Sequence, residues 1–226
     1  MFEGFSQATI DFLWGLKFNN ERSWFLAHKA EFQQVLDGPM KELAREVAEV
    51  MQEEFPDLQL QLKVSRIYRD ARRLFGRGPY KDHLWFSLRK PGEKDGAIPC
   101  LFFEVAPNGY SCGMGCYDPR PVTMAKLRAR IDRDPKPLEK LARRLEKHPE
   151  YRMEGERYKR PKGDVGPLLN PWYNSRHISV VREDNCEGIF FTPELKDQIL
   201  ADFRFLAPYY AYLRQLPSDP VPGEEN

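Results

Sequence analysis

The sequence has few cysteines and no long hydrophobic run. Only four of its 226 residues are cysteine, which is typical of a reducing compartment rather than of a disulfide-rich secreted fold. No apolar run reaches the ~20 residues that cross a bilayer. The first residues include Glu3 and Asp11, where a secretory signal needs positive charge. We therefore expect a cytoplasmic protein with no membrane partner.

Motifs for several common chemistries are also missing. The sequence contains no Gly-Lys-Ser/Thr phosphate loop and no dinucleotide fingerprint between a strand and a helix. Cys112 and Cys116 are four positions apart in an expected strand, about 13 Å at ~3.3 Å per residue, which is too far for one metal ion. The sequence therefore identifies no cofactor and no set of metal-binding residues.

Charge is plentiful but unevenly distributed. Charged residues make up 31% of a chain whose formal net charge is only +1. The segment 63–90 nevertheless holds nine Lys or Arg against two Asp, and 120–162 holds fifteen against seven acids. Two explanations remain open at this point: an anionic partner on one face, or acidic helices that pack over the basic segments.

Hydrophobic periodicity indicates helices, then strands, then helices. A period of two appears in several segments in the middle of the chain, and helical periods appear before and after them. This segregation predicts an α+β fold with an antiparallel sheet of about four to five strands, packed against N-terminal and C-terminal helices. We expect helices at 6–16, 21–36, 39–55, 124–131, 137–145 and 193–216, and strands at 60–64, 84–88, 98–105, 110–117 and 177–182.

The expected elements form one domain over residues 1–216. The segment 217–226 is rich in proline, acids and small polar residues, which predicts a disordered tail. The 98–105 segment is apolar on both faces and is expected to be a central strand. The two helices within 120–162 are expected to be exposed and basic.

The most unusual segment runs from Arg66 to Lys81. Cations packed this densely repel one another unless an anion lies among them. The side chains of Arg66, Arg69 and Arg72 have planar guanidinium groups suited to phosphate or carboxylate. We add Arg22, Arg160 and Lys162 as further ligand-binding candidates.

Three residues of this segment are candidates for catalysis. Lys81 is the strongest, because neighbouring cations lower the pKa of a lysine towards neutrality. Tyr80 could donate a hydrogen bond to an oxyanion. Asp70 lies among cations that depress its pKa, so we expect it to orient an arginine or to help hold a metal rather than to shuttle protons.

Several blocks of the sequence resemble one family. Asn19-Asn20 precedes Arg22 and Trp24-Phe25, Arg69-Asp70 precedes Arg72 and Pro79-Tyr80-Lys81, and Arg160 precedes Lys162-Gly163. Together these blocks resemble the family called domain of unknown function 2461, over the chain up to about Leu213. The family pattern carries Asp-Lys before Pro-Tyr-Lys, where this chain has Gly76 and Arg77, so its site is more basic. The family name implies no activity.

Three interpretations of the basic segment follow. The first is a protein that binds a phosphate- or carboxylate-bearing small molecule, with enzymatic activity left open. The second is a nucleic-acid-binding module that also uses the basic helices of 120–162. The third is an interaction or scaffold protein whose arginines form internal salt bridges. We favour the first interpretation, because internal pairing accounts for only some of these cations.

Overall fold

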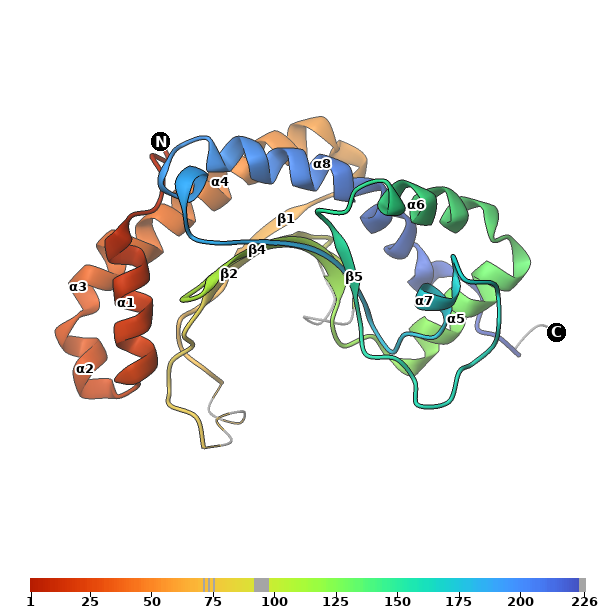
Figure 1. Ribbon diagram of the computed structural model, residues 1–226, viewed down its shortest axis with the longest axis horizontal. Helices are drawn as coiled ribbons and strands as arrows, with labels where there is room; N and C mark the ends of the chain where they lie inside the picture. Colours follow the sequence, from red (N-terminus) through yellow and green to blue (C-terminus); the bar gives the residue numbers. More distant parts are fainter. Residues whose placement is uncertain (71, 73, 75, 92–97, 224–226) are drawn as a thin grey trace. The chain divides into compact units, whose positions relative to one another are not determined.

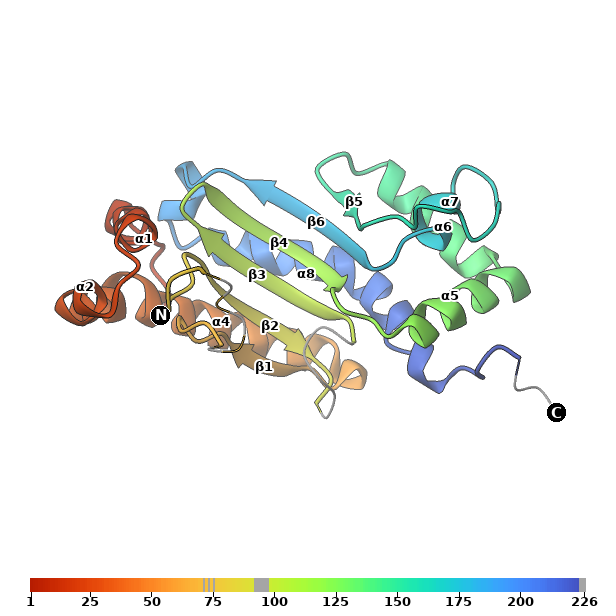
Figure 2. The same ribbon diagram turned by 90° about the horizontal axis from the view of Figure 1, so that it is seen from below.

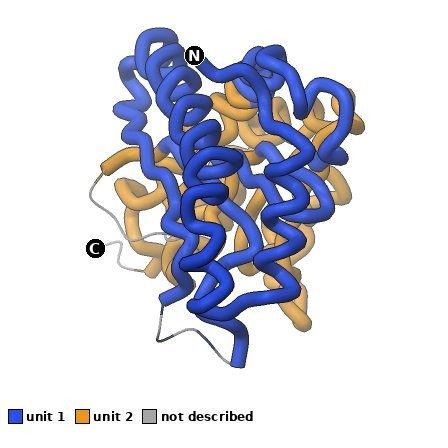
Figure 3. Tube along the Cα trace, turned by 90° about the vertical axis from the view of Figure 1, so that its left-hand side faces the viewer, with its two compact units in different colours: residues 1–88, 102–112, 183–202 blue, residues 89–101, 113–182, 203–226 orange. Residues whose placement is uncertain are grey.

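The chain forms two compact units, each assembled from three segments. The computed structural model describes residues 1–70, 72, 74, 76–91 and 98–223. Unit 1 comprises residues 1–88, 102–112 and 183–202, and unit 2 comprises 89–101, 113–182 and 203–226 (Figure 3). Neither unit is a continuous piece of the chain. The expected single domain over residues 1–216 stays a prediction.

The strands form one antiparallel sheet of six strands, which confirms the α+β class. Its order is β1-β2-β3-β4-β6-β5 (Figure 2). The expected number of four to five strands was too low, because β5 has only three residues and shows no periodicity. The strands are β1 Gln61–Val64, β2 Leu84–Arg89, β3 Cys100–Ala106, β4 Gly109–Cys116, β5 Arg152–Glu154 and β6 Ile178–Asp184.

Helices cover one face of the strands in unit 1. Figure 1 shows α4, Gly38–Glu54, and α8, Leu195–Leu213, on this face. Within unit 1, Lys196 of α8 forms an ion pair of 3.0 Å with Glu46 of α4. The strands turn apolar side chains to these helices in alternate positions. Phe103 of β3, for example, is fully buried and packs against the rings of Phe86 and Tyr110.

The N-terminal helices differ in one respect from the expectation. After α1, Gln7–Phe18, the expected helix over 21–36 consists of α2, Arg22–Ala27, α3, Lys29–Phe32, and a π-helical turn, Gln33–Asp37. That turn leads directly into α4, so Gly38 does not end a helix. The Gly38 amide donates to the carbonyl of Gln33 five residues earlier. This wider turn accommodates Pro39, which has no amide hydrogen to donate.

Unit 2 contains helices α5, Pro121–Arg133, α6, Lys136–Glu146, and α7, Asn170–Tyr173.

The expectation of an exposed α5 was wrong. Lys126 and Arg130 are each only 9% exposed. Lys126 Nζ donates to the carbonyl of Pro217 at 2.7 Å. Arg130 donates to the carbonyl of Tyr212 at 2.6 Å and pairs with Asp219 at 2.7 Å. These cations therefore hold the C-terminal segment rather than an outside partner.

The C-terminal segment has local structure where it is described. Leu216–Ser218 forms a 3₁₀ turn, and Asp219 pairs with Arg130 as described above. Residues 224–226 of the expected tail lie outside the described residues. In the described parts of the chain, none of the helices has the length and apolar character needed to cross a membrane.

Candidate functional site

The basic segment of unit 1 forms a narrow loop between β1 and β2. The expected strand ends at Val64, and the two sides of the loop pair again further on. The Arg69 amide donates to the carbonyl of Pro79 at 2.8 Å, and the Lys81 amide donates to that of Ile67 at 2.7 Å. Tyr68 and Tyr80 form an antiparallel bridge between these two hydrogen bonds. The loop leaves the sheet on the side opposite α4 (Figure 1).

The second side of this loop is attached to the N-terminal helices at Tyr80. Its backbone exchanges two hydrogen bonds of 2.9 Å with the side-chain amide of Asn20. Its ring is 2% exposed and stacks on Phe25 with centroids 4.2 Å apart. Burial raises the pKa of Tyr80, the neighbouring Tyr68 adds to the effect, and the charge of Arg22 opposes it. The hydroxyl thus stays protonated, with Arg22 nearby at the start of α2.

Arg69 lies inside the loop and binds groups of the protein. Its Nε donates to the carbonyl of Tyr80 at 2.7 Å, and its Nη2 lies 3.4 Å from Asp82 Oδ1. His83 Nδ1 lies 3.2 Å from the same Asp82 oxygen. Burial alone would raise the pKa of Asp82, but its own backbone amide, His83 and Arg69 together lower it. Asp82 is therefore an ionised partner that fixes the orientation of Arg69.

The other described arginines of the loop, Arg66, Arg72 and Arg77, are exposed. Asp70 accepts three hydrogen bonds from Arg72, of 3.0, 3.1 and 2.8 Å, so Asp70 orients an arginine. The guanidinium of Arg66 is exposed and has no hydrogen-bond or ion-pair partner among the described residues. Arg73, which adds to the charge of the segment in the sequence, lies outside the described residues.

Lys81 is the last cation of the loop before β2 begins at Leu84. Its Nζ donates to the carbonyl of Arg66 and lies 5.8 Å from the ring centre of Trp85 on β2. Lys63 Nζ lies 5.9 Å from the same ring. Burial lowers the pKa of Lys81, and the charges of Arg69, Lys63 and Arg66 lower it further, against the opposing charge of Glu104. The predicted direction of this shift is therefore present in the structure, with burial as its main cause.

Glu104 is the acidic counterpart of Lys81. It lies on β3 between Phe103 and Val105, which are fully buried on the helix-covered face. Glu104 therefore belongs to the opposite face, as does Trp85 on β2. Burial raises the pKa of Glu104, with Asp82 and Glu183 adding to the effect and His83 and Lys81 opposing it.

Sequence reasoning missed Glu104, because the apolar residues around it indicated a central strand without a site. The signal that could have found it is a single carboxylate inside an otherwise apolar strand. Burying a charged side chain in that position is costly unless the group has a use or a partner.

The other two predicted ligand residues belong to unit 2. Arg160 is exposed. Lys162 Nζ lies 4.7 Å from the ring centre of Tyr158. Their participation in the site of unit 1 stays a prediction. In the described portion of the chain, no group of three or more His, Cys, Asp or Glu is arranged to hold a metal ion.

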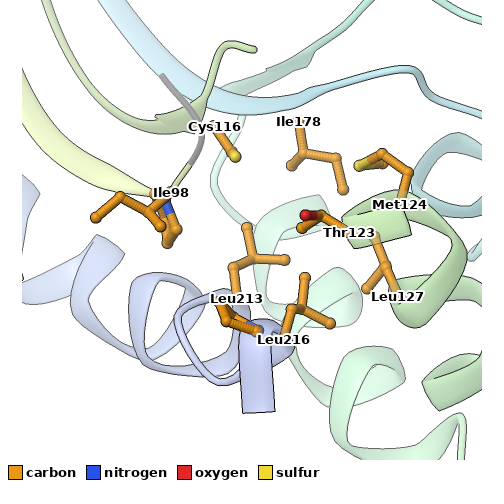
Figure 4. Close-up of a pocket in the computed structure, with 10 residues that line it drawn as sticks. Ile98, Cys116, Thr123, Met124, Leu127, Ile178, Leu213 and Leu216 are labelled. Atoms are coloured by element: carbon orange, nitrogen blue, oxygen red, sulfur yellow. The ribbon is translucent and has the colours of Figure 1, made fainter. Parts of the chain in front are cut away.

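Two cavities in unit 2 differ greatly in size. The one in Figure 4 has a volume of about 10 Å³, enough for a single water at most, and is lined by apolar side chains such as Met124 and Leu213. It is a gap in the packing and not a substrate site. The other has about 490 Å³ and lies between α5 and residues 219–222. Its wall includes Arg130 and Asp219, which bind each other.

Comparison with known proteins gives a family match over nearly the whole chain. No curated protein matches it. A family model described as "Conserved hypothetical protein (DUF2461)" matches residues 8–212 of the 226. The match includes both Asn20 and the loop that it holds. The chain therefore belongs to this family, as the resemblance of its motifs predicted.

Proposed function

We propose that unit 1 binds a small molecule bearing a phosphate or carboxylate group, on the sheet face that carries Lys81, Trp85 and Glu104. One observation carries this proposal. Lys81 Nζ and Lys63 Nζ lie 5.8 and 5.9 Å from the ring centre of Trp85, on the sheet face that also carries Glu104. Burial moves the pKa of Lys81 and that of Glu104 in opposite directions, each towards neutrality. Opposite shifts of this kind are typical of sites that bind and transfer protons.

The cations of the cluster supply the anion-binding groups. Arg66 has an exposed guanidinium without a protein partner among the described residues, and this group can bind phosphate or carboxylate through two hydrogen bonds. Lys63 and Lys81 add two point charges, 5.9 and 5.8 Å from the centre of the Trp85 ring. The exposed Arg22 and Arg72 contribute positive potential that attracts an anion before it binds.

The remaining predicted residues support the site in this proposal. Arg69 fixes Asp82 and the carbonyl of Tyr80, and the buried Tyr80 fixes the loop on Phe25. Asp70 holds Arg72. Glu104, protonated to a higher pH than an ordinary carboxyl, is the group that we assign to proton donation, and Lys81 is the group that binds the anion beside it.

The test is a thermal-shift screen at low salt with the full chain. The panel contains inorganic phosphate, sugar phosphates, nucleotides, dicarboxylates and a short single-stranded oligonucleotide. A ligand at a hundredfold excess over its Kd stabilises the folded protein by about 2.7 kcal/mol, which a melting curve resolves. We expect one class of small anion to raise the melting temperature, and both Lys81→Gln and Arg66→Gln to abolish the shift.

Lys29→Gln is the matched control. It removes one positive charge from an exposed position in unit 1 and should leave the shift unchanged. Equal loss in this control would show a general charge effect and contradict the proposal. A shift produced by the oligonucleotide alone would replace the proposal with the nucleic-acid interpretation. No shift with any compound would favour structural salt bridges.

Proton transfer is tested separately, once a ligand is known. Incubation of the protein with that ligand, followed by mass spectrometry, reports conversion. We expect Glu104→Gln to keep the thermal shift and to lose conversion, because the amide has nearly the same shape but cannot donate and regain a proton. Binding without conversion by the unmodified protein would leave a binding protein and remove the role of Glu104.

A further inference from the structure

In unit 2, two cations share one aromatic ring. The guanidinium carbon of Arg128, on α5, lies 5.6 Å from the ring centre of Tyr158. Lys162 Nζ lies 4.7 Å from the same ring centre. A ring offsets only part of the repulsion between two such charges. An anion that contacts both would offset the rest.

Arg128 is also the incompletely satisfied cation of its helix. Its Nη1 atom is buried and has no hydrogen-bond partner among the described residues. Lys126 and Arg130 on the same helix each donate to carbonyl oxygens of the C-terminal segment. A buried guanidinium nitrogen without an acceptor is unfavourable, so the buried Nη1 of Arg128 is a donor available to a ligand.

The loop that carries Lys162 is fixed by hydrogen bonds to α7 and to the residue after it. Asn174 binds this loop three times. Its carbonyl accepts from the Tyr158 amide at 3.0 Å, its Oδ1 accepts from the Lys162 amide at 2.6 Å, and its Nδ2 donates to the carbonyl of Gly163 at 3.0 Å. The backbone on both sides of the ring is thus held in place before any ligand arrives, which lowers the entropic cost of binding.

The nearest acid on α5 is already engaged elsewhere. Asp132 lies four residues after Arg128, the spacing of a helical ion pair. Its Oδ2 instead accepts a hydrogen bond from the Tyr173 hydroxyl at 3.1 Å. In the described residues, Arg128 and Lys162 form no ion pair with any carboxylate.

We propose that Arg128, Tyr158 and Lys162 form a second anion-binding site, for a phosphate group. The two cations come from different elements, so the ligand must offer acceptor oxygens in more than one direction. Phosphate has three such oxygens and close to two charges near pH 7, whereas the two oxygens of a carboxylate lie in one plane. Arg128 provides a planar fork and Lys162 a point charge. This site uses no residue of unit 1 and does not depend on the function proposed there.

The test follows backbone amide signals of the full chain by NMR while inorganic phosphate is added at constant ionic strength. We expect saturable shifts at Tyr158, Lys162 and Gly163. Lys162→Gln should weaken this binding roughly tenfold, the loss of about 1.4 kcal/mol that a charge-assisted hydrogen bond supplies. Lys159→Gln, an equal change of charge at another exposed position of the same loop, should alter it less than twofold.

Shifts that stay linear with phosphate, or that weaken equally in both variants, would overturn the site. The local signals also separate it from unit 1, since phosphate bound only near Lys81 would leave residues 158–163 unshifted. Arg128→Lys, checked by its melting curve, tests the second cation. It retains the charge without the fork, and we expect weaker binding. Binding as strong as in the unmodified protein would contradict a role for the guanidinium.

Discussion

Asn20 and Tyr80 are joined by two hydrogen bonds that run in opposite directions. The side-chain amide of Asn20 donates to the carbonyl of Tyr80 and accepts from its amide, both at 2.9 Å. A side chain thereby takes the place of a neighbouring strand. This pair connects two motifs that lie sixty residues apart, and it sets the position of the loop that ends at Lys81.

Replacing Asn20 by alanine should therefore destabilise unit 1. The Tyr80 amide would lose its partner and the Tyr80 carbonyl would keep only Arg69, in a partly buried position. We therefore expect a loss of about 1–3 kcal/mol in the free energy of unfolding. Urea denaturation measures it. Asn19→Ala is the control, because the side chain of Asn19 makes one exposed hydrogen bond, to the carbonyl of Gly15. An equal loss in both variants would contradict the special role of Asn20.

Gly78 should tolerate no side chain for the same reason. A Cβ atom at this position would overlap the side chain of Asn20, so Gly78→Ala should displace that amide from Tyr80. We expect a loss similar to that of Asn20→Ala. The double variant should lose much less than the sum of the two, because both changes break the same contact. Additive losses would show that Gly78 acts independently of Asn20.

Arg69 and Arg72 should differ sharply when each is replaced by alanine. The Arg69 side chain is 16% exposed and binds Tyr80 and Asp82, so we expect Arg69→Ala to cost roughly 1.5–3 kcal/mol of stability. The Arg72 side chain is 88% exposed, and an exposed ion pair contributes about 0–1 kcal/mol. Chemical denaturation at one salt concentration compares them. If Arg69→Ala left the stability unchanged, Arg69 would not be a structural group, and it would be available to bind an anion.

Glu104 should make stability fall with rising pH. Its pKa in the folded protein is raised above the ordinary 4.5, mainly by burial, so the folded state holds this proton to higher pH than the unfolded state. The free energy of unfolding therefore declines as the pH rises from about 4.5 through the raised pKa. Glu104→Gln should remove this decline. At a pH above the raised pKa, the variant should be more stable than the unmodified protein by about 1 kcal/mol.

The measurement is urea denaturation of both proteins from pH 4 to 9. Glu53→Gln, at an exposed position of α4, should leave the profile unchanged. A Glu104→Gln profile parallel to that of the unmodified protein would mean that Glu104 titrates as an ordinary exposed carboxyl.

Asp219 should hold the C-terminal segment on α5. Its side chain and that of Arg130 are 19% and 10% exposed, with 2.7 Å between the paired atoms. Asp219→Ala leaves Arg130 without its carboxylate, and we expect a loss of about 2 kcal/mol together with faster proteolysis after Leu216. Glu146→Ala, at an exposed position of α6, is the control. Unchanged cleavage would indicate that the segment is held by Lys126 and Arg130 through backbone carbonyls alone.

Periodicity predicted most of the fold because each long element buries one face. The alternation in β2 and the helical spacing in α4 both follow from this requirement. The three residues of β5 are too few to show a period. The passage from the π-helical turn into α4 was also hidden, since Gly38-Pro39 in sequence is typical of a helix boundary.

The site could be predicted only in part, because its character depends on contacts between distant residues. The loop motif predicted that neighbouring cations lower the pKa of Lys81, and it gave no sign that burial is the larger cause. The residues next to Arg69 in the sequence do not show that it binds Asp82. Those next to Asn20 do not show that it binds the backbone of Tyr80. Glu104 was hidden by its apolar neighbours. The sequence shows which charged residues are present, but the fold of the chain determines which of them form ion pairs.

The division of the chain into interleaved segments limits how its parts can be studied. Each unit consists of three segments separated by residues of the other, so no single cut releases either one intact. An N-terminal or a C-terminal half would lack part of each unit and leave apolar strand faces uncovered. Function should therefore be assigned with point substitutions in the complete chain. Loss of activity in a shortened version would report misfolding rather than the location of a site.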